Sequence, residues 1–191
     1  MMKHKIVLAS QSPRRQQLLA DMGIPFTIKT LDTNENYPDT LEANAVARYL
    51  ADKKADTYVS SLHDDEVVIT ADTTVVVDDL ILGKPENAEE ATAMLQQLSG
   101  KMHEVITGVC VCTKQSRHSF DDVTKVWFRE LDPDEIEHYI QTYRPFDKAG
   151  SYAIQEWIGM IGIEKIQGSY FNVVGLPAEK LYKTLKAMKI F

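Results

Sequence analysis

Two adjacent arginines near the beginning of the sequence form a candidate anion site. Arg14 and Arg15 fall in the first turn of a helix predicted over residues 13–22, with Ser12 as its N-cap and Pro13 as its first residue. Charge-assisted hydrogen bonds from two guanidinium groups to a phosphate contribute about 1.5–3 kcal/mol each, whereas the helix dipole adds roughly 0.3–1 kcal/mol. The alternative is an ordinary helix N-terminus with solvated arginines, although cations are electrostatically misplaced there unless an anion is bound.

A carboxylate interrupts an apolar strand pattern in the middle of the sequence. Asp72 lies between the apolar segments 67–71 and 75–77, where a charge is costly to bury unless it is paired, bound to a metal or functional. Lys84 lies at the end of a hairpin that starts from the same strand, so the two side chains could approach each other. The alternatives are a hydrogen-bonded structural aspartate and a solvated turn lysine.

Three other polar side chains give weaker local signals. Glu35 lies in a polar loop predicted over residues 32–38, and Lys54 lies near the end of an apolar stripe in a helix predicted over 41–58. Read alone, both are ordinary surface charges. Gln155 follows an apolar segment, and an amide at a strand end could recognise the edge of a base because it donates and accepts hydrogen bonds at once.

The elements that must position these residues alternate between helices and strands. Hairpins occur together with αβ units, so we predict an α/β fold with a mixed, curved central sheet flanked by helices. No repeat or linker divides the chain, which predicts a single domain over residues 1–191. Further strands are predicted over 25–31, 80–82, 102–112, 119–129, 152–154, 161–166 and 169–174, and further helices over 88–98, 133–143 and 178–188.

Composition narrows the class of partner. The chain has 191 residues, 44% of them hydrophobic, and a net charge of −7. This charge argues against a nucleic-acid polymer, which is bound through many Lys and Arg contacts, but it allows a small phosphorylated ligand in a local basic pocket. We find no apolar run long enough for a membrane span and no signal-peptide features in residues 1–4, so a cytoplasmic location is expected.

Cysteine and histidine usage gives no sign of a metal site. Cys110 and Cys112 fall on one face of a predicted strand and are expected to be reduced core residues. The five histidines show no metal-ligand spacing, and we predict that His103 is a hydrogen-bonded edge residue.

Ordered sequence blocks along most of the chain resemble the Maf family of nucleoside triphosphate pyrophosphatases. A chance match of so many blocks in the family's order is implausible. The blocks are Leu8-Ala9-Ser10-x-Ser12-Pro13-Arg14-Arg15, Ala71-Asp72-Thr73, Gly83-Lys84-Pro85, Leu98-Ser99-Gly100-Lys101-x-His103, Asp147-Lys148-Ala149-Gly150, Ile154-Gln155 and Gly168-Ser169-Tyr170 with Gly175-Leu176-Pro177.

The resemblance implies a fold and a set of roles. The fold would be related to the inosine triphosphate pyrophosphatases, with the substrate in a cleft between two lobes, and the protein would be a homodimer. Asp72 would be the general base, and Glu35 with Asp72 would hold a divalent metal ion. The residues that would bind the substrate are Ser10, Arg14, Arg15, Lys54, Thr73, Lys84 and Gln155.

The resemblance also implies a substrate. Within the family, selectivity goes with three positions, which here are Arg14, Thr73 and Gln155, and this combination resembles the dTTP/UTP branch. One departure is that the family usually follows the glutamine with glycine, whereas Glu156 and Trp157 follow here. Their bulk and charge are expected to lie beside the base pocket.

The implied activity is hydrolysis between the α and β phosphates of dTTP and UTP, and of modified pyrimidine nucleotides, to a monophosphate and pyrophosphate. Mg²⁺, or Mn²⁺ in its place, would offset the charge of the triphosphate. Two alternatives remain open at this point. One is a non-catalytic nucleotide-binding regulator of cell division and septum formation, and the other is a general phosphatase, which would release orthophosphate.

Overall fold

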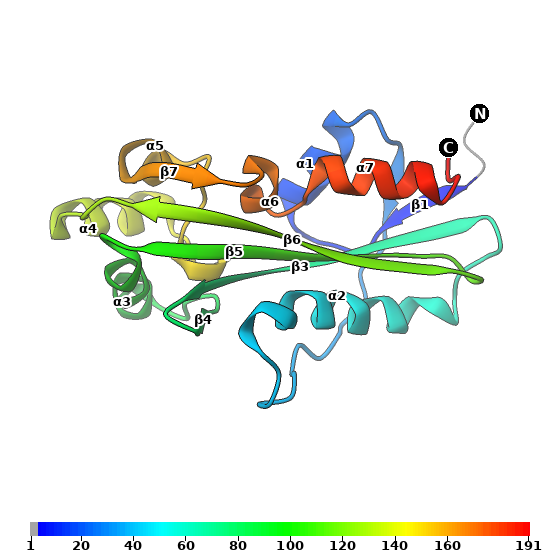
Figure 1. The fold of residues 1–191 in the computed structure, drawn as a ribbon, viewed down its shortest axis with the longest axis horizontal. Coiled ribbons are helices and arrows are strands. Elements are labelled where there is room, and N and C mark those ends of the chain that lie inside the picture. Colours follow the sequence, from blue (N-terminus) through cyan, green and yellow to red (C-terminus); the bar gives the residue numbers. More distant parts are fainter. Residues whose placement is uncertain (1–3) are drawn as a thin grey trace. The chain divides into compact units, whose positions relative to one another are not determined.

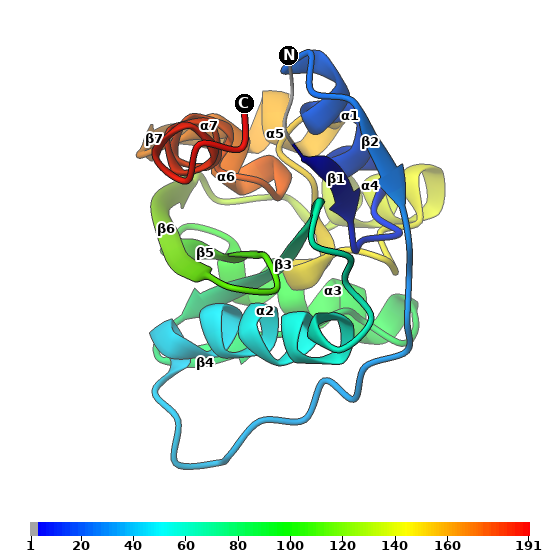
Figure 2. The same ribbon diagram turned by 90° about the vertical axis from the view of Figure 1, so that its right-hand side faces the viewer.

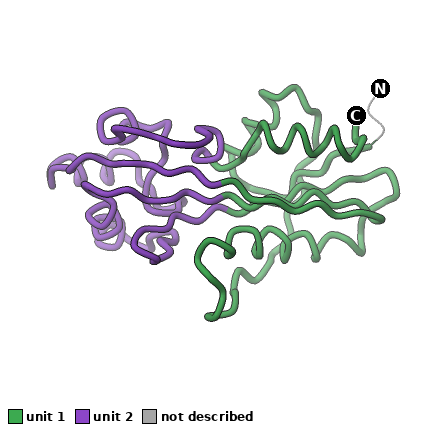
Figure 3. Tube along the Cα trace, in the orientation of Figure 1, with its two compact units in different colours: residues 1–72, 107–122, 175–191 green, residues 73–106, 123–174 purple. Residues whose placement is uncertain are grey.

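The chain folds into two compact units, which Figure 3 draws in different colours. The computed structural model describes residues 4–191, so residues 1–3, on which the signal-peptide prediction partly depends, lie outside the described residues. Unit 1 comprises Met1–Asp72, Thr107–Asp122 and Gly175–Phe191, and unit 2 comprises Thr73–Ile106 and Val123–Val174.

The strands of the described chain form one mixed sheet of seven strands in the order β2-β1-β3-β5-β6-β7, with β4 paired to β3. β1 is parallel to both of its neighbours, whereas β4 is antiparallel to β3 and β7 is antiparallel to β6. Helices flank the strands (Figure 1), which confirms the predicted fold class. The strands are β1 (Lys5–Leu8), β2 (Phe26–Ile28), β3 (Glu66–Val77), β4 (Leu80–Leu82), β5 (Met102–Cys112), β6 (Arg117–Phe128) and β7 (Ile163–Gln167).

In unit 1, helices cover both faces of the strands. α2 (Ala43–Val59) and α7 (Ala178–Ala187) lie on opposite sides, as the two views in Figures 1 and 2 agree, and α1 (Pro13–Asp21) follows β1. The predicted boundaries of these helices are confirmed to within two residues. One apolar cluster of this unit consists of Val7, Ala51, Ala55, Tyr58, Leu62, Val68, Cys110 and Cys112. Both cysteines are buried free thiols, as predicted, and burial raises the pKa of Cys110 to about 12.

Helix α2 packs closely on the sheet, and this contact places the helix that carries Lys54. A Cβ at Gly108 of β5 would lie 2.4 Å from backbone atoms of Ala47 and Arg48, a distance that no side chain tolerates. The start of α2 differs from the sequence prediction. Glu42 is the N-cap and makes no side-chain cap hydrogen bond, and the helix begins at Ala43, two residues after the predicted start.

Unit 2 contains the remaining helices. α3 (Ala88–Leu98) and α4 (Pro133–Tyr143) match the sequence prediction and contact each other. The shorter helices are the 3₁₀ turn η1 (Ala149–Ser151), α5 (Trp157–Gly162) and α6 (Tyr170–Val174). Within residues 4–191, no helix has both the length and the apolar character needed to cross a membrane. The core includes Val75, Leu82, Leu95, Leu98, Val105, Val126, Phe128, Ile136, Tyr139, Tyr152, Ile154 and Ile158.

Three local predictions are wrong. Residues 72–74 do not interrupt the strand, because β3 runs unbroken from Glu66 to Val77 and includes them. Residues 152–154 do not form a strand, and 170–174 form α6 where a strand over 169–174 was predicted. Short apolar runs suit a buried helical turn as well as a strand, and only packing distinguishes the two.

His103 lies inside the sheet, not at its edge. Its strand, β5, has β3 on one side and β6 on the other. The imidazole is 1% exposed, and Nε2 lies 2.7 Å from the hydroxyl oxygen of Tyr152. The predicted hydrogen bond is therefore confirmed, whereas the predicted edge position is wrong. Burial lowers the pKa of His103 to about 3.

This buried imidazole predicts sensitivity to acid. The unfolded chain binds a proton at His103 below about pH 6.5, and the folded chain does not until about pH 3, so stability falls as the pH drops through that window. Each pH unit costs up to roughly 1.4 kcal/mol at this site. Between pH 7 and pH 4.5, the free energy of unfolding of the wild type, measured in urea, should fall by about 2–3 kcal/mol more than that of His103→Gln. Equal pH slopes would contradict a buried neutral imidazole.

Candidate active site

The first turn of α1 forms a polar corner directly after β1. Ser12 is the N-cap and its Oγ accepts a hydrogen bond from the backbone N–H of Arg15 at 3.5 Å, with Pro13 as the first helical residue. Ser10 is 7% exposed, and its Oγ accepts from the backbone N–H of Ser12 at 3.2 Å. The predicted cap and helix are confirmed here, and the helix presents its N-terminus beside Ser10.

Arg15 anchors this corner to the rest of unit 1. Its Nε donates to the carbonyl of Gly175 at 2.8 Å, and its Nη1 donates to the carbonyl of Ala71 at 2.9 Å and to Ser10 Oγ at 3.5 Å. Burial lowers the pKa of Arg15, and the charge of Asp72 opposes that shift. An arginine remains cationic in such a site. Sequence reasoning treated Arg15 only as a phosphate ligand and missed this structural role.

Arg14 adds a second positive charge beside the first. The residue is half-buried, and its charge contributes to lowering the pKa of Arg15, so the two guanidinium groups lie within electrostatic reach of each other. Both stand at a helix N-terminus, where the dipole is also positive. This concentration of positive charge at one corner suits an anion.

A cluster of three charges lies in the same unit. The ammonium of Lys54 in α2 lies 2.8 Å from a carboxylate oxygen of Glu35 and forms an ion pair and hydrogen bond with Asp72 of β3. The side chains of Lys54 and Asp72 are 16% and 15% exposed, whereas that of Glu35 is 56% exposed. The fold therefore brings together three residues that local sequence patterns treated separately. The signal that could have found this cluster is the position of Lys54 on the buried stripe of α2.

The same cluster bears on metal binding. Glu35 and Asp72 direct carboxylate oxygens at one cation, the ammonium of Lys54. A hard divalent ion such as Mg²⁺ is commonly held by one or two carboxylates together with substrate phosphates, so this donor set fits such an ion. In the described part of the chain, no group of three or more His, Cys, Asp and Glu side chains could hold a metal ion.

The other predicted site residues belong to unit 2. Thr73 is half-buried in β3, directly after Asp72, and the division into units falls between these two residues. Lys84 is exposed in the segment after β4, where the carbonyl of Gly83 accepts a hydrogen bond from the N–H of Gly150 at 3.0 Å. The predicted approach of Lys84 to Asp72 joins the two units and stays a prediction.

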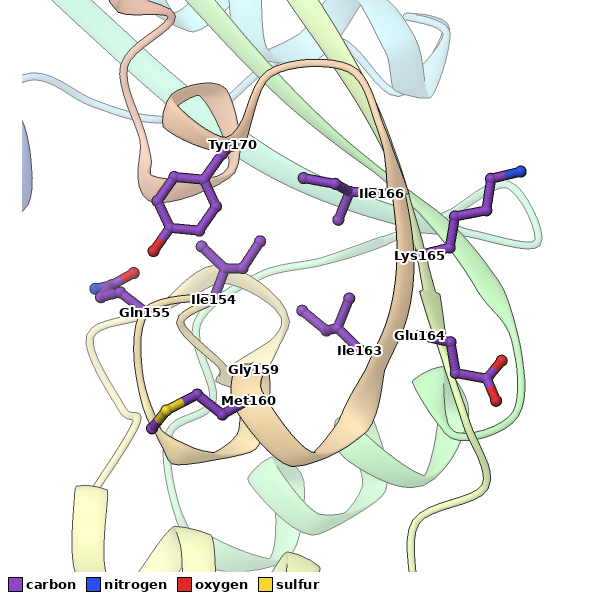
Figure 4. A pocket seen from close by; sticks show the side chains of 9 residues that line it. All are labelled: Ile154, Gln155, Gly159, Met160, Ile163, Glu164, Lys165, Ile166 and Tyr170. Carbon is purple, nitrogen blue, oxygen red and sulfur yellow. The ribbon is translucent and has the colours of Figure 1, made fainter.

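Gln155 lines a pocket of about 500 Å³ in unit 2, a size suited to a small ligand. Figure 4 shows its amide on the same side of the pocket as the hydroxyl of Tyr170, with Ile163 and Ile166 forming an apolar part of the wall. The residue lies in a turn before α5, so the predicted strand end is wrong, although Gln155 is exposed as a recognition residue must be. The full lining is Ile154, Gln155, Gly159, Met160, Ile163, Glu164, Lys165, Ile166 and Tyr170.

Glu156 and Trp157 are not among the residues that line this pocket. The carboxylate of Glu156 accepts a hydrogen bond from the hydroxyl of Tyr139, and the Trp157 ring contacts the ring of His138 with centroids 4.9 Å apart. Both side chains therefore pack against α4, and the expectation that their bulk and charge lie beside the base pocket stays a prediction. Tyr139 lies on the buried face of α4, and no feature of the sequence singled it out.

Comparisons with known proteins identify the family of this chain. The family model described as Maf-like protein matches residues 5–188. The chain is 54% identical over 187 residues to a dTTP/UTP pyrophosphatase of Phocaeicola vulgatus and 51% identical over 187 residues to one of Bacteroides fragilis, in each case with 97% of both chains covered. A solved structure of a nucleoside-triphosphatase / dITP/XTP pyrophosphatase from Mycobacterium abscessus is 15% identical, with a TM-score of 0.42 over 73% of this chain and 95% of that chain. Because the sequence matches extend over almost the whole length, the chain belongs to the Maf family.

Proposed function

We propose that this protein hydrolyses dTTP and UTP to the nucleoside monophosphate and pyrophosphate. The observation that carries the proposal is the half-buried Asp72 carboxylate, paired with Lys54 and within electrostatic reach of Arg15 at the polar corner of α1. A carboxylate beside a concentration of positive charge suits the attack of water on a phosphate chain. The relatives named dTTP/UTP pyrophosphatase support the choice of nucleotide.

In this reaction Asp72 accepts a proton from the attacking water. The water oxygen bonds to phosphorus as the P–O bond between the α and β phosphates breaks, and one water is consumed for each pyrophosphate released. Lys54 holds the Asp72 carboxylate in place through their ion pair. A positioned base contributes typically about 10²–10⁴ in rate, so the larger share of the acceleration must come from groups that stabilise the charge of the phosphates.

Those groups are Ser10, Arg14, Arg15 and Lys84. Arg15 is held by two backbone carbonyls, so its guanidinium is preorganised and costs little conformational entropy when phosphate binds. Arg14, Thr73 and Gln155 select the base in this proposal. Glu35 and Asp72 would hold Mg²⁺ or Mn²⁺, and the metal ion would offset the negative charge of the triphosphate.

The non-catalytic regulator is the less favoured alternative. A nucleotide sensor needs no general base, whereas the relatives at about 50% identity are named as enzymes and this chain has the candidate base Asp72. The homodimer and the cytoplasmic location stay predictions.

The first test is a panel of canonical and modified nucleoside triphosphates with Mg²⁺, scored separately for pyrophosphate and orthophosphate. We expect pyrophosphate and monophosphate in equal amounts, with dTTP and UTP as the preferred canonical substrates. Orthophosphate as the product would indicate a general phosphatase. Saturable nucleotide binding without any product would indicate a sensor.

Replacing the proposed base tests the mechanism. Asp72→Asn keeps the size of the side chain but cannot accept the proton, so we expect kcat to fall by roughly 10²–10⁴ with nucleotide Kd within severalfold of wild type. Asp79→Asn is a matched control, because Asp79 is exposed in a turn with a φ of 63°, which asparagine also adopts readily. Full activity in Asp72→Asn would remove Asp72 from this role.

Removing the half-buried arginine tests the anion corner. Arg14→Ala should raise the KM for dTTP and UTP roughly ten- to a hundredfold, because it loses a charge-assisted hydrogen bond to phosphate, and it should change the preference between dTTP and GTP. The exposed Arg48 of α2 provides the control Arg48→Ala, which should leave both parameters unchanged. Wild-type kinetics in Arg14→Ala would mean that the corner is not the phosphate site.

A further inference from the structure

One buried hydroxyl forms hydrogen bonds with both ends of the turn that carries Gln155. Tyr139 of α4 is fully buried, and its hydroxyl oxygen accepts a hydrogen bond from the backbone N–H of Ala153 at 3.2 Å. The same hydroxyl donates to the carboxylate of Glu156. Ala153 and Glu156 flank Ile154 and Gln155, so a single side chain from a separate helix closes the turn around the exposed glutamine.

The carboxylate of Glu156 has a second partner. Its Oε1 lies 3.4 Å from the ammonium of Lys148, which also pairs with Asp147 at 2.7 Å. The Lys148 side chain is only 8% exposed, and the Glu156 side chain is 21% exposed. Interactions of this kind are stronger away from water, and removing one partner leaves another buried charge unpaired. Glu156 is therefore fixed by both a hydroxyl and an ammonium.

Burial and the neighbouring Glu156 raise the pKa of Tyr139. The phenol accordingly stays protonated at neutral pH and remains a donor to the carboxylate. Its ring is held as well, because it stacks on Tyr143 with centroids 5.1 Å apart and an interplanar angle of 25°. The hydroxyl therefore has little freedom to move away from the turn.

The start of α5 closes the turn from the other side. A Cβ at Gly159 would lie 1.9 Å from the carbonyl oxygen of Ile154, so α5 approaches the Gln155 turn more closely than any side chain would allow. The N–H of Gly159 donates to the carbonyl of Glu156 at 3.0 Å, which continues the turn directly into the helix. The backbone on each side of Gln155 thus has a defined partner.

An amide discriminates between bases only when its orientation is fixed, because its carbonyl and NH₂ ends present opposite hydrogen-bonding patterns to the base edge. A glutamine on a loose turn would adapt to several bases and lose that discrimination. We propose that Tyr139 and Glu156 are positioning residues that hold Gln155 at the rim of its pocket and so set the base selectivity of this protein. The inference rests on the proposed function, in which Gln155 contacts the base.

This role accounts for an acidic side chain directly after Gln155. A glycine at this position could offer no carboxylate to a tyrosine or a lysine. In this chain the acidic side chain faces Tyr139 and Lys148 instead of the pocket, so it stiffens the turn without adding charge to the wall. The residue acts through Gln155 and does not touch the base.

The test removes the hydroxyl and keeps the ring. For Tyr139→Phe we expect the ratio of kcat/KM for dTTP to that for GTP to fall roughly five- to tenfold, the size expected for one hydrogen bond, mainly through a higher KM for dTTP. Inhibition by inorganic triphosphate, which has no base, should be unchanged. Tyr143→Phe is the matched control, because it removes a hydroxyl from the neighbouring ring of the same helix and should leave the ratio unchanged.

A double-mutant cycle with Gln155→Ala distinguishes positioning from general stability. If Tyr139 acts through Gln155, the double variant should be no less selective than Gln155→Ala alone. Additive losses, or an equal fall in kcat for every nucleotide with no change in the ratio, would overturn the proposal. Glu156→Gln keeps an acceptor for Tyr139 but loses the charge that faces Lys148, so its selectivity should fall by a smaller factor than that of Tyr139→Phe. If Tyr139→Phe does not fold, Glu156→Gln provides the same test.

Failure of the proposed function gives a different result. Wild-type protein that releases no pyrophosphate from any nucleotide would overturn the enzyme assignment. The selectivity of the turn is then measured by the Kd values of dTTP and GTP for the same set of variants. Equal Kd ratios in wild type and Tyr139→Phe would overturn the positioning role independently of catalysis.

Discussion

The carboxylates of Glu35 and Asp72 share one cation, and much of unit 1 is arranged so that this can happen. Two like charges at a partly buried site are tolerated only when an opposite charge lies between them, and the Lys54 ammonium supplies it. Lys54 reaches them because α2 packs against β5 at Gly108 closely enough to exclude any side chain. The backbone of Asp72 lies within the unbroken strand β3, so the position of its carboxylate is fixed by the sheet.

Arg15 links this cluster to the polar corner of α1, because its charged guanidinium binds two backbone carbonyls. Its guanidinium joins the carbonyl of Ala71, directly before Asp72, to the carbonyl of Gly175 ahead of α7. The same group therefore holds backbone segments together and brings positive charge near Asp72. Preorganised charge of this kind is what phosphate chemistry requires, because it costs no reorganisation when substrate binds.

Unit 2 follows the same principle with different groups. There the buried partners are a tyrosine, a glutamate and a lysine, and they hold the turn of an uncharged glutamine beside a largely apolar pocket. In the proposed function Asp72, Ser10, Arg14 and Arg15, which act on the phosphates, belong to unit 1, whereas Gln155, which contacts the base, belongs to unit 2. Both units place a functional side chain next to a backbone group that a buried neighbour holds by a hydrogen bond.

Local chemistry was enough to determine much of this protein from its sequence. The cap at Ser12 with Pro13, the cap at Asn87 and the capping box of Asp132 and Glu135 are satisfied by nearby backbone, so the helices that follow them were predicted correctly. The order of short blocks also identified the family. Tertiary structure alone decided the Glu35–Lys54–Asp72 cluster, the anchoring of Arg15 and the orientation of Glu156 toward Tyr139. Each of these joins residues 17 or more positions apart, and their pairing depends on how the elements pack on one another, which no local pattern encodes.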